Sequence, residues 1–362
     1  MRRFVHLGLI FLSTLSGWTI AVSASPSKVT QISRQCVTSN ATNTMHKTIN
    51  GANDTIAVPV HWNGILLLYS HGYLDASSPI MNPGPDAPDQ TTASKLLEEG
   101  YALAGSSYSQ NGWVAKLGMD ETLELLNYFD ETCGTPKGTI TWGESMGGLI
   151  SATLAHYYSR RFTAALLMCG VLTIGKGKLV IPVLTMHTTG DDFVSVHIEN
   201  TYAKIVKEAG SGAMLRQIYV AHNGHCNFTP GDNLAAVHTL INTALNHGGK
   251  WGNYDPNKHP DQLNSKANSY GPQYNSAPPN FQTYTPDPPP SPLYYPTLDM
   301  GSSPDDITSP DDVTSPNDVT SKDKTSDKSP APHKSPAPHK SPTPHKPSTG
   351  SHHSQADHVS TE

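Results

Sequence analysis

Between Thr55 and Trp251 the sequence alternates short apolar runs with segments whose apolar residues recur at helical spacing. The runs, such as "GILLLYSHGY" and "GTITWGES", are apolar along most of their length, as expected of strands buried on both faces. The intervening "LGMDETLELLNYFDETCG" places Leu123 and Leu126 on one helical face and acidic residues on another. This alternation predicts an α/β fold in which helices flank a mostly parallel sheet.

The same patterns place the individual elements. We expect strands over 64–73, 101–109, 138–145, 162–172, 180–192 and 213–225, and helices over 117–134, 147–162, 197–210 and 232–249. The last helix is expected to carry Asp232 or Asn233 at its N-cap and to end at Gly248.

Beyond Trp251 the composition changes to Pro, Ser, Asp, Lys and His with almost no aliphatic residues, and six-residue repeats such as "SPDDIT" and "SPAPHK" appear. We therefore divide the chain into a signal peptide (1–24), a folded domain (25–251) and a low-complexity tail (252–362) that is expected to be disordered or extended. Repeats of this kind are typical of spacers, so we predict contact of the tail with a cell wall or matrix. Whether residues 270–297 lie against the domain is left open.

The N-terminus has the three parts of a secretory signal peptide. Arg2 and Arg3 precede the apolar "FVHLGLIFLSTL", and the small residues of "AVSA" follow where a signal peptidase would cut. A membrane anchor is the alternative, but the apolar stretch is shorter than the roughly 20 residues that a span requires. We expect a secreted, extracellular protein with no transmembrane anchor after cleavage, and the sequons at Asn40, Asn53 and Asn227 are compatible with glycosylation on that route.

Four cysteines follow the signal peptide: Cys36, Cys133, Cys169 and Cys226. An even number in an oxidising compartment permits two disulfides, and the sequence leaves three pairings open. Cys169 lies in an apolar run, so a buried free thiol is the alternative for this residue. No CxxC pair or Cys/His spacing indicates structural zinc.

The charge of the chain argues against two classes of partner. The formal net charge is −6, and no basic cluster resembles a nucleic-acid-binding surface. No GxxxxGK loop that would hold nucleotide phosphates is present. We therefore expect no nucleic-acid partner.

The stretch from Gly143 to Gly147, "GESMG", satisfies G-x-S-x-G between an expected strand and an expected helix. A sharp turn from strand to helix exposes the serine hydroxyl there, and the small flanking residues allow the backbone to make the turn. A structural turn is the alternative reading. The context favours Ser145 as a nucleophile.

A nucleophilic serine needs a base and an orienting carboxylate, and later strands end in candidates for both. His225 follows the last expected strand in "VAHNGHCNF", and we prefer it to His222, which lies within or at the edge of that strand. Asp191 directly follows the turn glycine of "HTTGDD", and we prefer it to Asp192. The chain order Ser, Asp, His is the one expected for this architecture.

Charge that develops on a substrate carbonyl oxygen requires fixed donors. Two backbone amides are candidates, that of Tyr73 in "SHGY" and that of Met146, which follows the nucleophile. An ordinary loop turn is the alternative for His71-Gly72. We predict an oxyanion hole formed by Tyr73 and Met146.

The motifs "LLLYSHGY", "GYALAGSSYSQNGW", "WGESMGG", "LTMHTTGD" and "GHCNFT" occur in this order and resemble those of secreted members of the α/β-hydrolase superfamily. The resemblance covers roughly Thr48 to Gly249. It implies an eight-stranded, mostly parallel sheet and a Ser145–Asp191–His225 triad. It also implies hydrolysis of an ester or amide bond through an acyl-enzyme.

One connection departs from the pattern of this superfamily, in which a lid commonly follows the run that bears "CGVL". After Leu172 only about half a dozen residues precede the next apolar run, whereas parallel neighbours need a crossover of a dozen or more. Three arrangements are compatible with the sequence. The strand ends early, near Leu167; the run does not pair in the sheet; or the lid and crossover helix have been lost.

The sequence thus predicts a secreted serine hydrolase that needs no metal or organic cofactor and acts on a small-molecule ester or, less favoured, a peptide. An open site without a lid suits small esters better than peptides that must be positioned. The alternative is a weak or inactive protein of the same fold that acts by binding through its repeat tail.

Overall fold

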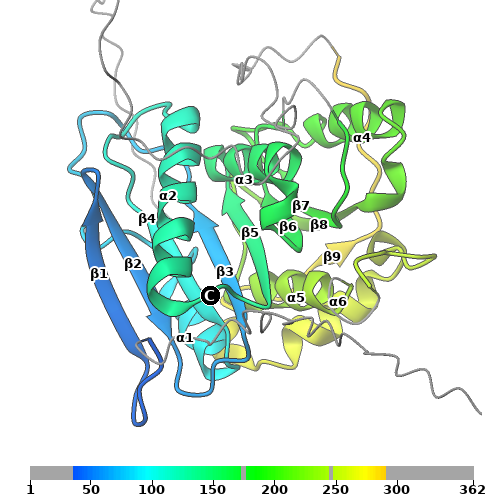
Figure 1. Cartoon of the computed structure of the whole chain (residues 1–362). Coiled ribbons are helices and arrows are strands. Elements are labelled where there is room, and N and C mark those ends of the chain that lie inside the picture. The colour runs from blue at the N-terminus through cyan, green and yellow to red at the C-terminus, as the bar shows by residue number, and fades with distance from the viewer. Residues whose placement is uncertain (1–35, 173–176, 244–247, 291–362) are drawn as a thin grey trace, which may run out of the picture. The chain divides into compact units, whose positions relative to one another are not determined.

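The computed structural model describes residues 36–172, 177–243 and 248–290, and these form one body around a nine-stranded sheet. The strand order is β1-β2-β4-β3-β5-β6-β7-β8-β9, which runs from left to right in Figure 1. The predicted signal peptide and the six-residue repeats lie outside the described residues.

The strands from β4 to β8 are parallel. At one end of the sheet β1 pairs with β2 and β2 with β4, and at the other end β9 pairs with β8, all antiparallel. The strands are β1 (Asn43–Ile49), β2 (Ala52–Val58), β3 (Ile65–Ser70), β4 (Ala102–Ser106), β5 (Gly138–Glu144), β6 (Ala164–Met168), β7 (Val183–Gly190), β8 (Leu215–Asn223) and β9 (Phe281–Gln282). All six predicted strands are present, and the predicted mostly parallel α/β fold is confirmed. The sheet has one strand more than the resemblance implied, because residues beyond the predicted domain add β9.

Six α-helices in the described ranges cover the two faces of this sheet: α1 (Gln90–Glu98), α2 (Ala115–Cys133), α3 (Met146–Tyr157), α4 (Ile198–Glu208), α5 (Pro230–Ile241) and α6 (Pro260–Asn268). Helices α2, α3 and α4 contribute Phe129, Leu149 and Tyr202 to the core on one face. Helices α1, α5 and α6 contribute to the core on the other face. In Figure 1, α2 and α3 lie in front of the sheet.

Strand β3 shows why its sequence is apolar without interruption. Leu66 and Leu68 point into the core beneath α2 and α3, and Leu67 and Tyr69 point into the core on the opposite face. Because successive side chains of a strand alternate between faces, a strand covered on both faces must be apolar at every position.

The connection between β6 and β7 answers the question that the sequence raised. The two strands are parallel neighbours, with Met168 opposite Met186. Strand β6 ends at Met168, so the prediction of a strand to residue 172 is wrong, and residues 169–182 form the crossover. No helix occurs in its described parts, 169–172 and 177–182. Leu172, Leu179 and Ile181 fill the core on the α3 and α4 face, where a crossover helix would otherwise pack.

The last predicted helix begins earlier than expected. Its N-cap is Thr229, whose side chain accepts a hydrogen bond from the Asp232 amide, while the Asp232 carboxylate accepts one from the Thr229 amide. Pro230 occupies the first helical position, where a missing N–H costs nothing. Asp232 is therefore the third residue of the helix rather than its N-cap.

The region directly after Trp251 also differs from the prediction, because it packs on the domain instead of beginning a tail. Leu263, Ala267 and Phe281 are buried in the core on the α5 face. Strand β9 pairs with β8 and covers the edge of the sheet. The domain therefore extends past the predicted boundary, since a few well-spaced apolar residues suffice to attach a polar segment to an existing core. None of the helices in the described part of the chain is long and apolar enough to cross a membrane.

A buried carboxyl group on β2 makes the stability of this fold sensitive to pH. Asp54 is 2% exposed, and burial, with a contribution from the nearby Glu121, raises its pKa from 3.8 to about 7. The folded protein therefore binds a proton at Asp54 that the unfolded chain releases above about pH 4, so stability falls as the pH rises from about 4 to about 7.

The substitution Asp54→Asn removes this ionisation. The Tm of the variant should exceed that of the unmodified protein by a larger margin at pH 8 than at pH 5. Thermal unfolding followed by circular dichroism at both pH values measures the difference, and Glu131→Gln, at an exposed position of α2, is the control. An advantage of the Asn variant that is equal at both pH values would contradict the assignment.

Candidate functional site

Ser145 occupies a strained turn between β5 and α3. Its backbone has φ +56° and ψ −119°, a conformation that non-glycine residues rarely adopt, and 8% of the residue is exposed. A Cβ atom on Gly147 would lie 1.9 Å from the Ser70 carbonyl oxygen, and one on Gly143 would lie 2.5 Å from the Gly147 carbonyl oxygen. Only glycine fits these two positions, which explains the spacing of the motif.

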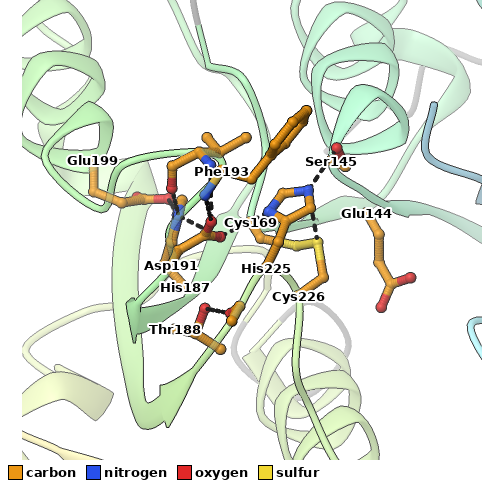
Figure 2. Close-up of a disulfide and its surroundings, with 12 residues drawn as sticks. Glu144, Ser145, Cys169, His187, Thr188, Asp191, Phe193, Glu199, His225 and Cys226 are labelled. Atoms are coloured by element: carbon orange, nitrogen blue, oxygen red, sulfur yellow. Dashed lines mark hydrogen bonds and ion pairs between the residues drawn. A yellow bond between two sulfur atoms is a disulfide. The ribbon is translucent and has the colours of Figure 1, made fainter. Parts of the chain in front are cut away.

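The hydroxyl of Ser145 meets His225, and His225 meets Asp191 (Figure 2). The His225 Nε2 lies 2.8 Å from Ser145 Oγ, and its Nδ1 lies 2.8 Å from Asp191 Oδ2. Since a carboxylate can only accept, Nδ1 carries the proton, and a neutral ring then offers Nε2 as the acceptor for the serine hydroxyl. The three residues follow β5, β8 and β7, so the carboxyl ends of parallel strands bring them together.

The Asp191 carboxylate has partners on both oxygens. Oδ1 accepts hydrogen bonds from the amides of Phe193 (2.9 Å) and Val194 (2.8 Å), and Oδ2 faces both His225 and His187. Burial alone would raise the pKa of Asp191, but these hydrogen bonds outweigh it and hold the pKa below its ordinary value. Asp191 is therefore ionised at neutral pH.

His187 and Glu199 belong to the same cluster and were not predicted from the sequence. Both side chains are fully buried, and His187 Nδ1 lies 3.1 Å from Glu199 Oε1. Burial alone would lower the pKa of His187, but its hydrogen bonds to Asp191 and Glu199 raise it to about 9. The one feature of the sequence that could have indicated His187 is that it is a lone histidine inside an apolar strand, four residues before Asp191, in "LTMHTTGD".

A disulfide joins Cys169 to Cys226 directly beside His225, and a second joins Cys36 to Cys133. This settles the pairing that the sequence left open, and Cys169 is not a free thiol. Cys169 follows Met168, whose carbonyl oxygen accepts a hydrogen bond from the Ser145 amide at 2.9 Å. The disulfide thus connects the loop of His225 to the strand end that holds the turn of Ser145. Because both sulfurs are oxidised, the cluster of Cys169, His225 and Cys226 lacks the thiolates that a metal ion requires.

The structure also brings the loop after β3 next to Ser145. A Cβ atom on Gly72 would lie 3.3 Å from Ser145 Cβ, so the chain leading to Tyr73 passes beside the serine. His71 fixes this loop, because its ring stacks on Tyr108 at 4.0 Å and lies within hydrogen-bond distance of the Gly72 and Ser107 carbonyl oxygens. Met146 is the first residue of α3, where backbone amides have no acceptor within the helix.

Three exposed aromatic side chains surround this edge of the sheet. Phe193 is 70% exposed, and its ring centroid lies 5.2 Å from that of His225. In Figure 2 it lies beside the contact of His225 with Ser145. Tyr73 (44% exposed) and Trp113 (41% exposed) lie on the loops that follow β3 and β4. Neither Phe193 nor Trp113 was predicted as a site residue, because exposure of an aromatic side chain is a property of the folded chain.

His222 and Asp192, the alternatives to His225 and Asp191 in the sequence, do not join this cluster. The His222 ring is within hydrogen-bond distance of the Asn227 and Pro278 carbonyl oxygens instead of the Ser145 hydroxyl. Asp192 is exposed to solvent next to Asp191.

No protein-family model matches the chain. A stretch of 91 residues is 30% identical to an o-phthalyl amidase of Xanthobacter agilis, which corresponds to 25% of this chain and 19% of that protein. The match therefore spans about a fifth of the length of that relative.

Solved structures with a similar arrangement include dipeptidyl peptidase 4 of Porphyromonas gingivalis, at 11% identity and a TM-score of 0.45, which covers 57% of this chain and 36% of that one. They also include esterase 2 of Thermogutta terrifontis, at 16% identity and a TM-score of 0.42, which covers 58% of this chain and 94% of that one.

The fold follows from the chain's own topology. A central parallel sheet is flanked by helices on both faces, a G-x-S-x-G turn joins β5 to α3, and an Asp and a His follow β7 and β8 in that order. These features together define the architecture. The chain has the α/β-hydrolase fold.

Proposed function

We propose that the protein is a serine hydrolase that cleaves carboxylic esters, with Ser145 as nucleophile, His225 as general base and Asp191 as the orienting acid. The observation that carries the proposal is the unbroken pair of 2.8 Å contacts that links the Asp191 carboxylate, the His225 ring and the Ser145 hydroxyl. A hydroxyl so placed transfers its proton to Nε2 as it attacks.

The reaction proceeds in two halves. Ser145 Oγ forms a bond to the carbonyl carbon, its proton moves to His225, and the amides of Tyr73 and Met146 stabilise the negative oxygen. The tetrahedral intermediate releases the alcohol, which takes the proton from His225, and an acyl-enzyme remains. Water then attacks the acyl-enzyme, with His225 again as the base, and the carboxylic acid is released. These steps require no metal or organic cofactor.

The surroundings of Ser145 favour a small ester with an apolar part. The crossover between β6 and β7, residues 169–182, is too short to hold a lid domain that could position a long peptide. Phe193 lies beside the Ser145–His225 contact and offers an apolar wall. Amide hydrolysis is the second candidate, and the local similarity to an amidase favours it.

Two disulfides are consistent with export to an oxidising environment, and we propose that the protein is secreted. Attachment of the repeat tail to a wall or matrix belongs to the same proposal. The alternative, an inactive protein that binds through its tail, is disfavoured because the geometry around Ser145 suits catalysis.

A fluorophosphonate probe tests the nucleophile. The purified protein should become covalently labelled, and Ser145→Ala should abolish labelling because the attacking oxygen is gone. The substitution His225→Gln should slow labelling by about 100-fold or more, since it removes the base. The measurement is probe fluorescence per folded protein.

A serine variant on α6, Ser265→Ala, is the control and should label normally. Absence of labelling in unmodified protein that is folded by circular dichroism would overturn the enzyme proposal and favour the binding alternative.

The apolar wall is tested by Phe193→Ala. This variant should lower kcat/KM about 3- to 10-fold for p-nitrophenyl benzoate, because an aromatic contact is lost, and should leave p-nitrophenyl acetate nearly unaffected. Val180→Ala removes an exposed apolar side chain in the connection that precedes β7 and is the matched control. Equal losses for both esters would show that Phe193 acts on the geometry of His225 instead of on the substrate.

A further inference from the structure

A second histidine lies behind the Asp191 carboxylate, on the side away from His225 (Figure 2). The Nε2 atom of His187 is 2.9 Å from the Val194 carbonyl oxygen and 3.4 Å from Asp191 Oδ2. Its Nδ1 atom is 3.1 Å from Glu199 Oε1. All three of these partner atoms are acceptors. A neutral imidazole has a single N–H and would leave one nitrogen facing an acceptor without a proton.

We propose that His187 is a positioning residue that carries a positive charge, so that the Asp191 carboxylate is shared between two imidazole rings and His225 faces a partly neutralised acid. This inference rests on the proposed serine-hydrolase function. It adds a component to that site, because His187 touches neither Ser145 nor the space in which a substrate would lie.

Glu199 is the group that keeps the charge on His187. Its carboxylate is fully buried, and its Oε2 atom accepts hydrogen bonds from Thr185 Oγ1 and from the Gln217 side-chain amide, both at 2.5 Å. Oε1 faces His187. With Oε2 satisfied by these donors, Oε1 is placed to attract an imidazolium at His187.

Other titratable groups packed near this cluster do not compete for the role. Tyr202 of α4 and Tyr219 of β8 face Glu199, and burial raises the pKa of both phenols, so they stay neutral. On the other side, the charged group facing His225 is Asp191, and the Phe193 ring covers part of its surface.

The charge on His187 has a definite consequence for His225. A positive charge beside the shared carboxylate disfavours a second proton on the neighbouring ring. A neutral substitute for His187 should therefore make His225 bind its proton more tightly.

The test uses His187→Gln and the double variant His187→Gln/Glu199→Gln, which does not leave Glu199 as an unpaired buried charge. The acid limb of the pH profile of kcat/KM for p-nitrophenyl acetate should move to higher pH, by about one pH unit in the single variant and by less in the double variant. A role in packing alone would lower kcat/KM at every pH without moving this limb.

The matched control is His238→Gln on α5, which breaks another histidine–glutamate pair. In that pair His238 Nε2 lies 2.7 Å from Glu99 Oε2. Its acid limb should not move. An unmoved limb in both His187 variants, or a limb that moves to lower pH, would overturn the proposal.

A titration of the histidine rings by NMR decides the inference even if no ester is hydrolysed. In the Ser145→Ala protein, His187 should stay protonated between about pH 5 and pH 8, and the titration midpoint of His225 should rise when His187 is replaced. A neutral His187 at pH 7 would overturn the inference and leave the proposed function standing. Absence of hydrolysis with a charged His187 would overturn the proposed function and leave the charge assignment standing.

Discussion

The site depends on the carboxylate of Asp191, both of whose oxygens have polar partners. One oxygen holds the amides of Phe193 and Val194 and so fixes the turn after β7, and the other oxygen faces two histidine rings. Burial of an unpaired carboxylate would cost several kcal/mol, so these contacts are needed for the side chain to remain there as an anion. The same side chain therefore contacts His225, holds the amide of Phe193 and, in the arrangement proposed above, faces a protonated His187.

The second constraint is the short crossover between β6 and β7. Without a helix in its described residues, the connection still fills the core with Leu172, Leu179 and Ile181. The Cys169–Cys226 disulfide joins the start of this connection to the loop of His225. The strand ends and this covalent link thus position Ser145 and His225, and the described part of the crossover contributes no lid. Under the proposed function, a site that no lid covers would admit water, which weakens electrostatic stabilisation of the transition state.

The parts of this arrangement that depend on local patterns could be predicted from the sequence. The glycines of G-x-S-x-G, and the placement of Asp191 and His225 after apolar runs, follow from strand ends and turns. Other parts depend on contacts between distant segments. In the sequence, Glu199 is one of two glutamates on a predicted helix, and only the packing of α4 on β7 brings it to His187. The end of β6 at Met168 and the attachment of β9 to β8 arise in the same way, because local apolar composition does not show where pairing stops.

The central claim is that Ser145 forms a covalent acyl intermediate during turnover, and rapid acid quenching during hydrolysis of p-nitrophenyl acetate tests it most directly. Peptide mass spectrometry of the quenched protein should find one acetyl group on Ser145, which disappears once the substrate is consumed. Turnover of the ester with no acetyl group on Ser145, or with the group on another residue, would contradict the account.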